Sequence, residues 1–232
     1  MKKHSRFYLV ILFATLALLA PHAYCQSHYQ AHVHVGFHGG MTLSEMAWSP
    51  SVRQSFVTGF TGGVSARYAE ERHVGILAEL NVSQRGWKEN FEELPFSYAR
   101  RLTYVELPIM THIFFGSRTV KGFFNLGPEI GLMLADDITA NFDYANPGNV
   151  EGFPTNNRSV LQMAMPIHTR FDYGITAGAG AEFVIARRHS FTIEGRYYFG
   201  LGNIFASSKK DPFSASRGTS IMVTVGYMFR LK

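Results

Sequence analysis

Histidines near the start of the chain are the first side chains whose type and spacing could do chemistry. His32, His34 and His38 alternate along one stretch, and His28 precedes them. Alternate residues of a β-strand lie on one face about 7 Å apart, so His32 and His34 could share a metal ion if their rings converged. The stretch offers no obvious carboxylate partner, and hydrogen bonding accounts for such histidines equally well. We therefore predict no metal site and no bound cofactor.

Acidic side chains form the second set that could be reactive. Glu79, Glu106, Glu129 and Glu182 could supply a general acid and a general base, but their even distribution over separate segments favours one network of charges. A serine hydrolase would need a nucleophile supported by a base, and no G-x-S-x-G elbow is present. The glycines form neither a G-x-G-x-x-G motif before a helix nor a Walker loop. We expect a protein that is not an enzyme.

Composition and charge narrow the class of protein. The chain has 232 residues, of which 46% are hydrophobic and 17% charged, with 22 glycines and one cysteine. This length suits one large all-β domain or two small ones, and the single cysteine excludes a disulfide scaffold. The formal charge of +5 includes Lys2, Lys3 and Arg6, which leaves 19 bases against 17 acids in the rest of the chain. We expect no nucleic-acid partner.

Residues 1–25 resemble a secretory signal peptide. A basic start is followed by an apolar run over residues 7–20, shorter than the roughly 20 residues that a spanning helix needs, and then by small residues. Cleavage after Cys25 would place Ala23 at position −3, and cleavage after Ala23 is the alternative. The sequence predicts that residues 1–25 are removed and that residues 26–232 form one exported domain.

Period-two alternation of apolar and polar residues recurs through the rest of the chain. It predicts eight strands, over residues 30–41, 56–68, 74–84, 101–114, 122–134, 169–185, 191–199 and 219–231. Their connections alternate between short and long, which is typical of an outer-membrane barrel with periplasmic turns and external loops. We predict an all-β fold: an eight-stranded antiparallel up-and-down transmembrane β-barrel with short periplasmic turns and long external loops.

The residues on the polar strand face indicate which face lines the lumen and which face contacts lipid. Charged side chains stand at mid-strand on that face: Arg67, Glu79, Glu106, Glu129, Asp172, Glu182, Glu194 and Arg196. A base facing lipid at the midplane would cost about 2–4 kcal/mol, whereas the lumen of an eight-stranded barrel lets charges pair. We predict that these eight residues form an ion network in the lumen. Aromatic residues near the predicted strand ends suggest a girdle at the membrane interfaces: Tyr68, Trp87, Tyr104, Tyr197, Tyr227 and Phe229.

Five motifs in order resemble a known family. They are residues 36–68 with the Gly-Gly-Met sequence at 39–41, ELNVSQRGW at 79–87, YVELP at 104–108, NLGPEIG at 125–131 and VGYMFRL at 225–231. Together they resemble the PorT-like family of small outer-membrane β-barrels of Gram-negative bacteria. The resemblance implies the fold and the cell-envelope location, and it points only weakly to a part in secretion.

Three functions are compatible with the sequence. The leading hypothesis is an integral outer-membrane barrel, non-enzymatic, that acts as a structural or secretion- and assembly-associated component. Its partners would be outer-membrane lipid and, through the external loops, other envelope or secretion proteins. The alternatives are a small porin-like channel and a soluble, secreted, lipocalin-like ligand-binding barrel. The long loop over residues 136–168 interleaves polar residues with the aromatics Phe142, Tyr144 and Phe153 and could form a recognition surface.

Overall fold

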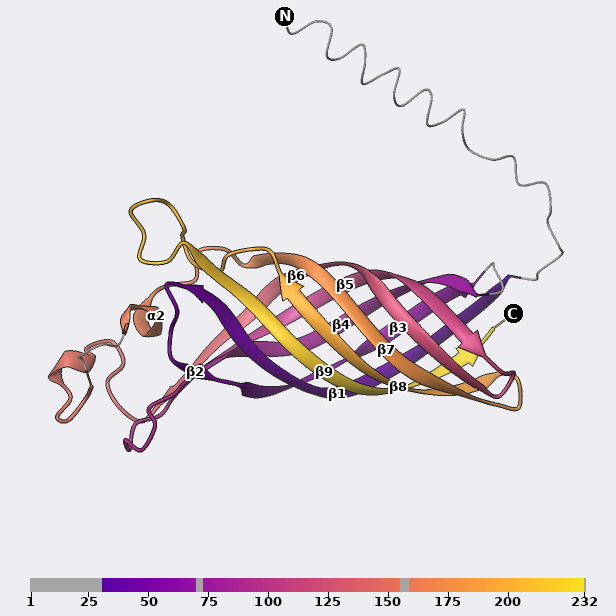
Figure 1. The fold of residues 1–232 in the computed structure, drawn as a ribbon, viewed down its shortest axis with the longest axis horizontal. Helices are drawn as coiled ribbons and strands as arrows, with labels where there is room; N and C mark the ends of the chain where they lie inside the picture. The colour runs from indigo at the N-terminus through magenta and orange to yellow at the C-terminus, as the bar shows by residue number, and fades with distance from the viewer. Residues whose placement is uncertain (1–30, 70–72, 155–158, 232) are drawn as a thin grey trace, which may run out of the picture. The chain divides into compact units, whose positions relative to one another are not determined.

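A single antiparallel sheet dominates the computed structural model, which describes residues 31–69, 73–154 and 159–231. Its strands are tilted around a common axis in Figure 1. The eight long strands are β1 (His32–Ser49), β3 (Val57–Ala69), β4 (Val74–Glu89), β5 (Tyr98–Gly116), β6 (Val120–Ala140), β7 (Phe171–Ile185), β8 (His189–Gly200) and β9 (Ala215–Arg230). A short strand, β2 (Gln54–Ser55), pairs with the end of β4.

The sheet closes on itself. Each long strand pairs with the next one along the chain, and β1 pairs with both β3 and β9. In the closing pair, Val35 lies opposite Phe229 and Leu43 lies opposite Ile221. Every one of the eight long strands therefore has two hydrogen-bonded neighbours, so the ring has no exposed edge. This arrangement confirms the predicted eight-stranded up-and-down barrel.

Side-chain alternation turns the apolar residues outward. Along β9, Val223 and Val225 are 54% and 62% exposed, whereas the intervening Thr224 is buried. Because successive side chains of a strand point to opposite faces, the same alternation in the other long strands covers the outer wall with apolar groups. The inner face carries buried polar and charged side chains, which is the reverse of a water-soluble barrel.

Several strands run further than the sequence predicts at the end with the long connections. β1 continues to Ser49 rather than residue 41, β4 to Glu89 rather than 84, and β6 to Ala140 rather than 134. The outward positions in these extensions include Lys88 and Asp137. With polar residues outside and large residues inside, the extensions lack the apolar face by which the strands were predicted.

Short and long connections lie at opposite ends of the barrel. The described short ones are residues 117–119 and 186–188, and residues 70–72 of the third lie outside the described part. The longest connection, after β6, contains the 3-10 helix η1 (Pro147–Asn149) and the helix α2 (Leu161–Ala164). None of the helices in the described ranges is long and apolar enough to cross a bilayer. The predicted signal peptide falls in residues 1–30, outside the described residues.

Candidate functional site: the barrel lumen and the external cap

Arg67 and Glu182 form the ion pair nearest the short-turn end of the lumen. Arg67 is on β3 and Glu182 is on β7, across the bore. Arg67 Nη2 donates to Glu182 Oε1 over 2.7 Å, and Nη1 donates to Oε2 over 3.1 Å. Two parallel bonds of this kind give a charge-assisted pair with a defined orientation. The pair therefore ties opposite walls of the barrel together.

Arg196 lies between two carboxylates further along the bore. Its Nη1 is 2.6 Å from Glu79 Oε2, and its Nη2 is 2.8 Å from Glu194 Oε2. Glu79 also accepts a hydrogen bond from Asn81 Nδ2 and lies 3.7 Å from the His38 ring. The three charged side chains are all at least nine-tenths buried. Arg196 therefore balances charge that would be very costly to bury alone.

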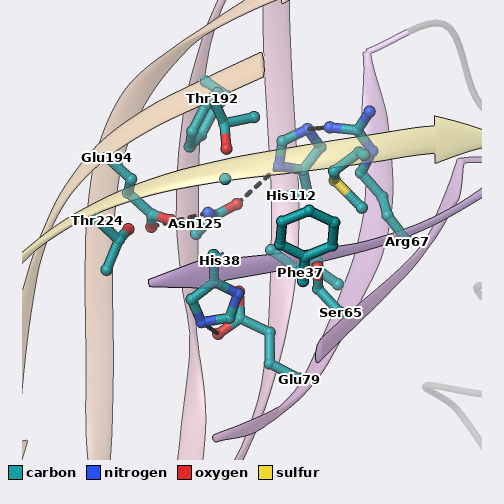
Figure 2. A pocket seen from close by; sticks show the side chains of 14 residues that line it. Phe37, His38, Ser65, Arg67, Glu79, His112, Asn125, Thr192, Glu194 and Thr224 are labelled. Atoms are coloured by element: carbon teal, nitrogen blue, oxygen red, sulfur yellow. Dashed lines mark hydrogen bonds and ion pairs between the residues drawn. The ribbon is translucent and has the colours of Figure 1, made fainter. Parts of the chain in front are cut away.

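His112 and Asn125 connect these two ion pairs (Figure 2). Arg67 Nη1 lies 3.2 Å from His112 Nε2, and because a guanidinium only donates, Nε2 must accept. The ring proton is therefore on Nδ1, which donates to Asn125 Oδ1 over 2.7 Å. Asn125 Nδ2 in turn donates to Glu194 Oε1 over 2.9 Å. A continuous hydrogen-bond network thus links Glu182 to Glu79, and within it donation runs from Arg67 through His112 and Asn125 to Glu194.

A small cavity borders this chain. Its volume is about 30 Å³, and its lining includes His38, Ser65, Thr192 and Thr224 (Figure 2). A single water needs roughly 10–15 Å³ on this measure, so the cavity has space for about two waters and not for an organic ligand. This part of the lumen is therefore filled by its own side chains.

Arg85 organises the next layer toward the long-loop end. Its Nη2 lies 2.8 Å from Glu106 Oε1 and its Nη1 lies 3.3 Å from Asp172 Oδ2. The guanidinium stacks between Tyr104 and Tyr198, 4.4 and 4.1 Å from the ring centroids. Aromatic faces stabilise a cation through their quadrupoles. Tyr198 also donates to Asp172 Oδ2 over 2.9 Å, so this layer is both charged and tightly packed.

A hydrophobic cluster, here called the external cap, closes the barrel above that layer. It is built on Trp48, Trp87, Phe91, Phe153, Phe205 and Phe213. These residues come from β1, β4 and the three long connections that follow β4, β6 and β8. Trp48 packs edge-on against Trp87 and stacks on Phe205, with centroids 5.3 and 5.6 Å apart. The cap is a small folded core in its own right.

Polar contacts fasten the longest connection to the barrel. Tyr98 donates to the carbonyl of Met163 over 2.7 Å, and Arg100 donates to the carbonyl of Met165 over 2.8 Å. Arg100 also forms a two-bond pair with Asp136, at 2.7 and 2.6 Å. These contacts fix the connection after β6 to the barrel at Met163 and Met165. Its Phe153, predicted to take part in a recognition surface, is buried in the cap.

The turn at Asp143 in this connection contains a carboxylate that accepts three hydrogen bonds. The side-chain amide of Asn146 and the backbone N–H groups of Ala145 and Asn146 donate to the exposed Asp143 carboxylate. Hydrogen bonds to the charged form lower the pKa of Asp143 below its ordinary value. The turn therefore presents a carboxylate that stays ionised under mildly acidic conditions.

A family model decides the class of this barrel. The model described as "Outer membrane protein beta-barrel domain" matches residues 24–206. The chain belongs to this family. It is therefore an integral outer-membrane protein, with its apolar wall in lipid and, as in other such barrels, short turns in the periplasm and long loops outside. The lipocalin-like alternative, which needs an oily interior and a polar exterior, is excluded.

Solved structures show distant likenesses. Neisserial surface protein A is 12% identical, with 87% of this chain and 99% of that one covered and a TM-score of 0.45. Ail of Yersinia pestis, in complex with the heparin analogue sucrose octasulfate, is 11% identical, with 85% and 99% covered and a TM-score of 0.40. OprG of Pseudomonas aeruginosa is 9% identical, with 86% and 95% covered and a TM-score of 0.47. No curated protein matches the chain.

All eight residues of the predicted ion network lie inside this outer-membrane barrel. Seven of them form the ion pairs described above, and Glu129 is buried beside them with its Oε1 lacking a hydrogen-bond partner in the described part of the chain. Arg85 was missed, because the predicted third strand stops at residue 84. Arg85, Trp87 and Glu89 continue the period-two spacing of Glu79, Asn81 and Ser83, and this continuation would have revealed it.

Two of the six predicted girdle residues are wrong. Trp87 is fully buried in the external cap, and Tyr104 lies inside against Arg85. Both occupy inward positions: Trp87 is on the same face of β4 as Arg85, and Tyr104 is on the same face of β5 as Glu106. Tyr68 and Tyr197 do face outward and are exposed, and Tyr227 and Phe229 are half-buried near the periplasmic end.

The histidines of β1 are spaced along the inward face of this one strand. His34 is buried, His38 lies beside Glu79 and His32 contacts Arg230. Within the described ranges, no three His, Cys, Asp or Glu side chains gather as a metal site would require. The structure gives His38 and His32 partners other than a metal ion.

The outer wall supports a direct test of orientation. Leu126 on β6 is 58% exposed on the lipid-facing side. We expect Leu126→Arg to lower the free energy of unfolding by about 2–4 kcal/mol if it lies near the midplane, because a guanidinium enters hydrocarbon. Urea unfolding in phospholipid vesicles measures this, with Leu126→Ala as the matched control. An arginine variant no less stable than the alanine variant would contradict the orientation.

Proposed function

We propose that this protein is a closed, non-enzymatic barrel that anchors a folded external cap in the outer membrane as a structural or assembly component. The observation that carries the proposal is the filled lumen, in which Arg67, Arg85 and Arg196 each pair with a carboxylate from a facing strand. Above this network the external cap occupies the mouth of the barrel. We expect neither layer to leave a continuous water path, because side chains fill the bore.

The non-enzymatic part of the proposal is supported by the state of the lumen carboxylates. Glu79, Glu182 and Glu194 each accept hydrogen bonds from an arginine. A general base needs a lone pair directed at its substrate, whereas these oxygens are directed at guanidinium groups. The residues thus serve as structural cross-links.

A role in secretion or assembly rests on the PorT-like sequence resemblance and on the shape of the external end. Because three long connections and β1 share one hydrophobic core, they can present a fixed surface to another envelope protein. Pull-down from detergent-solubilised outer membrane tests this role. A partner should be lost when exposed residues of the long connections around the cap, such as Leu94 and Leu161, are changed to serine, and it should be retained by Arg118→Ser in a periplasmic turn. Equal capture by both variants would contradict recognition through the cap.

Closure of the lumen makes its own prediction. Purified protein in a planar bilayer should give no sizeable steady conductance, because charged pairs and rings fill the bore. Reproducible open-channel currents that change in Glu106→Gln or Glu129→Gln would overturn the proposal in favour of the small porin-like channel. An unrelated outward substitution, Leu126→Ala, serves as the control for handling of the bilayer.

A further inference from the structure

A hollow lies in the outer wall toward the periplasmic end of the barrel. The small residues Gly36, Ala66 and Ala78 line it on adjacent strands β1, β3 and β4. The register places Ala66 between Val35 and Ala78, so small side chains form one row across the wall. Larger apolar residues, among them Phe37, Leu80, Leu107, Tyr227 and Phe229, border this row.

The hollow is large enough for a ligand and almost entirely apolar. Its volume is about 660 Å³, within the range of roughly 300–1,000 Å³ found for small-molecule sites. A depression of this size in the lipid-facing wall is complementary to a chain of hydrocarbon.

Basic residues stand at one end of the hollow. Phe229, which lines it, lies opposite His189 in the register, and Tyr227 hydrogen-bonds to His189 Nδ1 over 2.6 Å. The turn just before His189 carries Arg187 and Arg188, both exposed. The carbonyl of Arg188 accepts the backbone N–H of Arg230, the residue after Phe229, over 2.8 Å. The backbone of Arg188 therefore lies beside Arg230, one residue after Phe229 at the border of the hollow.

The described charged residues of the turns at the periplasmic end are Arg118, Arg187 and Arg188, and all are basic. The turn between β3 and β4 also carries Glu70, Glu71 and Arg72 in the sequence, and these residues lie outside the described part. A guanidinium pairs well with a phosphate because its fork of N–H donors matches two oxygens.

We propose that the hollow binds one acyl chain of an anionic phospholipid of the inner leaflet, whose phosphate is held by Arg187 and Arg188. The hydrocarbon covers Ala66 and Ala78, and the phosphate lies at the level of the arginine turn. A second copy of the chain is the alternative occupant, and the test below distinguishes it from a lipid.

The test compares two lipids with identical acyl chains, anionic phosphatidylglycerol and zwitterionic phosphatidylcholine. Native mass spectrometry of the full chain in detergent counts retained lipid as each is titrated. We expect one phosphatidylglycerol to be retained preferentially. The double variant Arg187→Asn/Arg188→Gln should lower its affinity about tenfold to thirtyfold, because each arginine near a lipid surface contributes about 1 kcal/mol. Asn suits position 187, where φ is +62°.

Filling the hollow tests the acyl-chain part independently. Ala66→Phe should lower the retention of both lipids, with Ala78→Leu as a second filling variant in case the first folds poorly. Ala179→Phe, at an outward-facing alanine on β7, and Arg118→Gln are the matched controls. Equal retention by Ala66→Phe and Ala179→Phe overturns the groove, and equal affinity for the two lipids overturns the phosphate contact. Dimers that Ala66→Phe abolishes would assign the hollow to a second copy. None of these results depends on whether the lumen conducts or the cap recruits a partner.

Discussion

Replacing Arg196 by methionine is expected to lower the free energy of unfolding by about 3–5 kcal/mol, the cost of leaving a buried charge without its partner. The substitution leaves both Glu79 and Glu194 without their guanidinium, in a part of the lumen where their side chains are less than a tenth exposed. Methionine restores much of the volume, so lost packing contributes little. The loss is therefore electrostatic in origin.

Urea unfolding in vesicles measures this loss, followed by the fluorescence of Trp48 and Trp87. The triple variant Arg196→Met/Glu79→Gln/Glu194→Gln should recover much of the stability, because it removes the uncompensated charges along with the arginine. Arg118→Met, in an exposed turn, should have almost no effect. An unfolding midpoint for Arg196→Met equal to that of Arg118→Met would contradict the proposed importance of the lumen network.

Phe205→Ala is expected to destabilise the external cap by about 3–5 kcal/mol, as large-to-small changes in a packed core do. Phe205 is almost completely buried and contacts Trp48, Trp87 and Phe213. The membrane-spanning part of the barrel does not include these contacts. Loss of the side chain should therefore loosen the connections while the strands remain paired.

Two measurements separate the cap from the barrel. Limited proteolysis should cut the long connections of Phe205→Ala faster than those of the original chain, whereas heat-modifiable migration on a gel, which reports the closed barrel, should be retained. The control is Phe124→Ala, since Phe124 is 53% exposed on the lipid-facing wall. Unchanged cleavage in Phe205→Ala would show that the cap is not held by this aromatic cluster.

The sequence predicted which face of each strand is charged, since alternation depends only on neighbouring residues. Glu79 and Arg67 could be placed inside on that basis. Their partners could not, because Arg67 meets Glu182 across 115 positions of sequence and only the closed register brings the two together. Pairing across a bore is a property of the whole ring.

The external end was the part least accessible to sequence reasoning. Its strands exchange an apolar outer face for an apolar inner one, so the alternation that identifies a membrane strand no longer applies. Arg85 was missed and Trp87 was assigned to a girdle for this reason. Phe153 was read as part of a loop surface because nothing in the local pattern shows that distant loops meet in one core.

The hydrogen bonding of β9 to β1 has a consequence for biogenesis. The two strands are nearly the full length of the described chain apart, so their pairing is among the least local in the molecule, and such contacts form slowly. Until β9 arrives, two strands have unsatisfied backbone groups that hydrocarbon does not tolerate. We therefore expect insertion to be concerted, with a chain truncated before residue 215 left in the periplasm instead of integrated as a partial sheet.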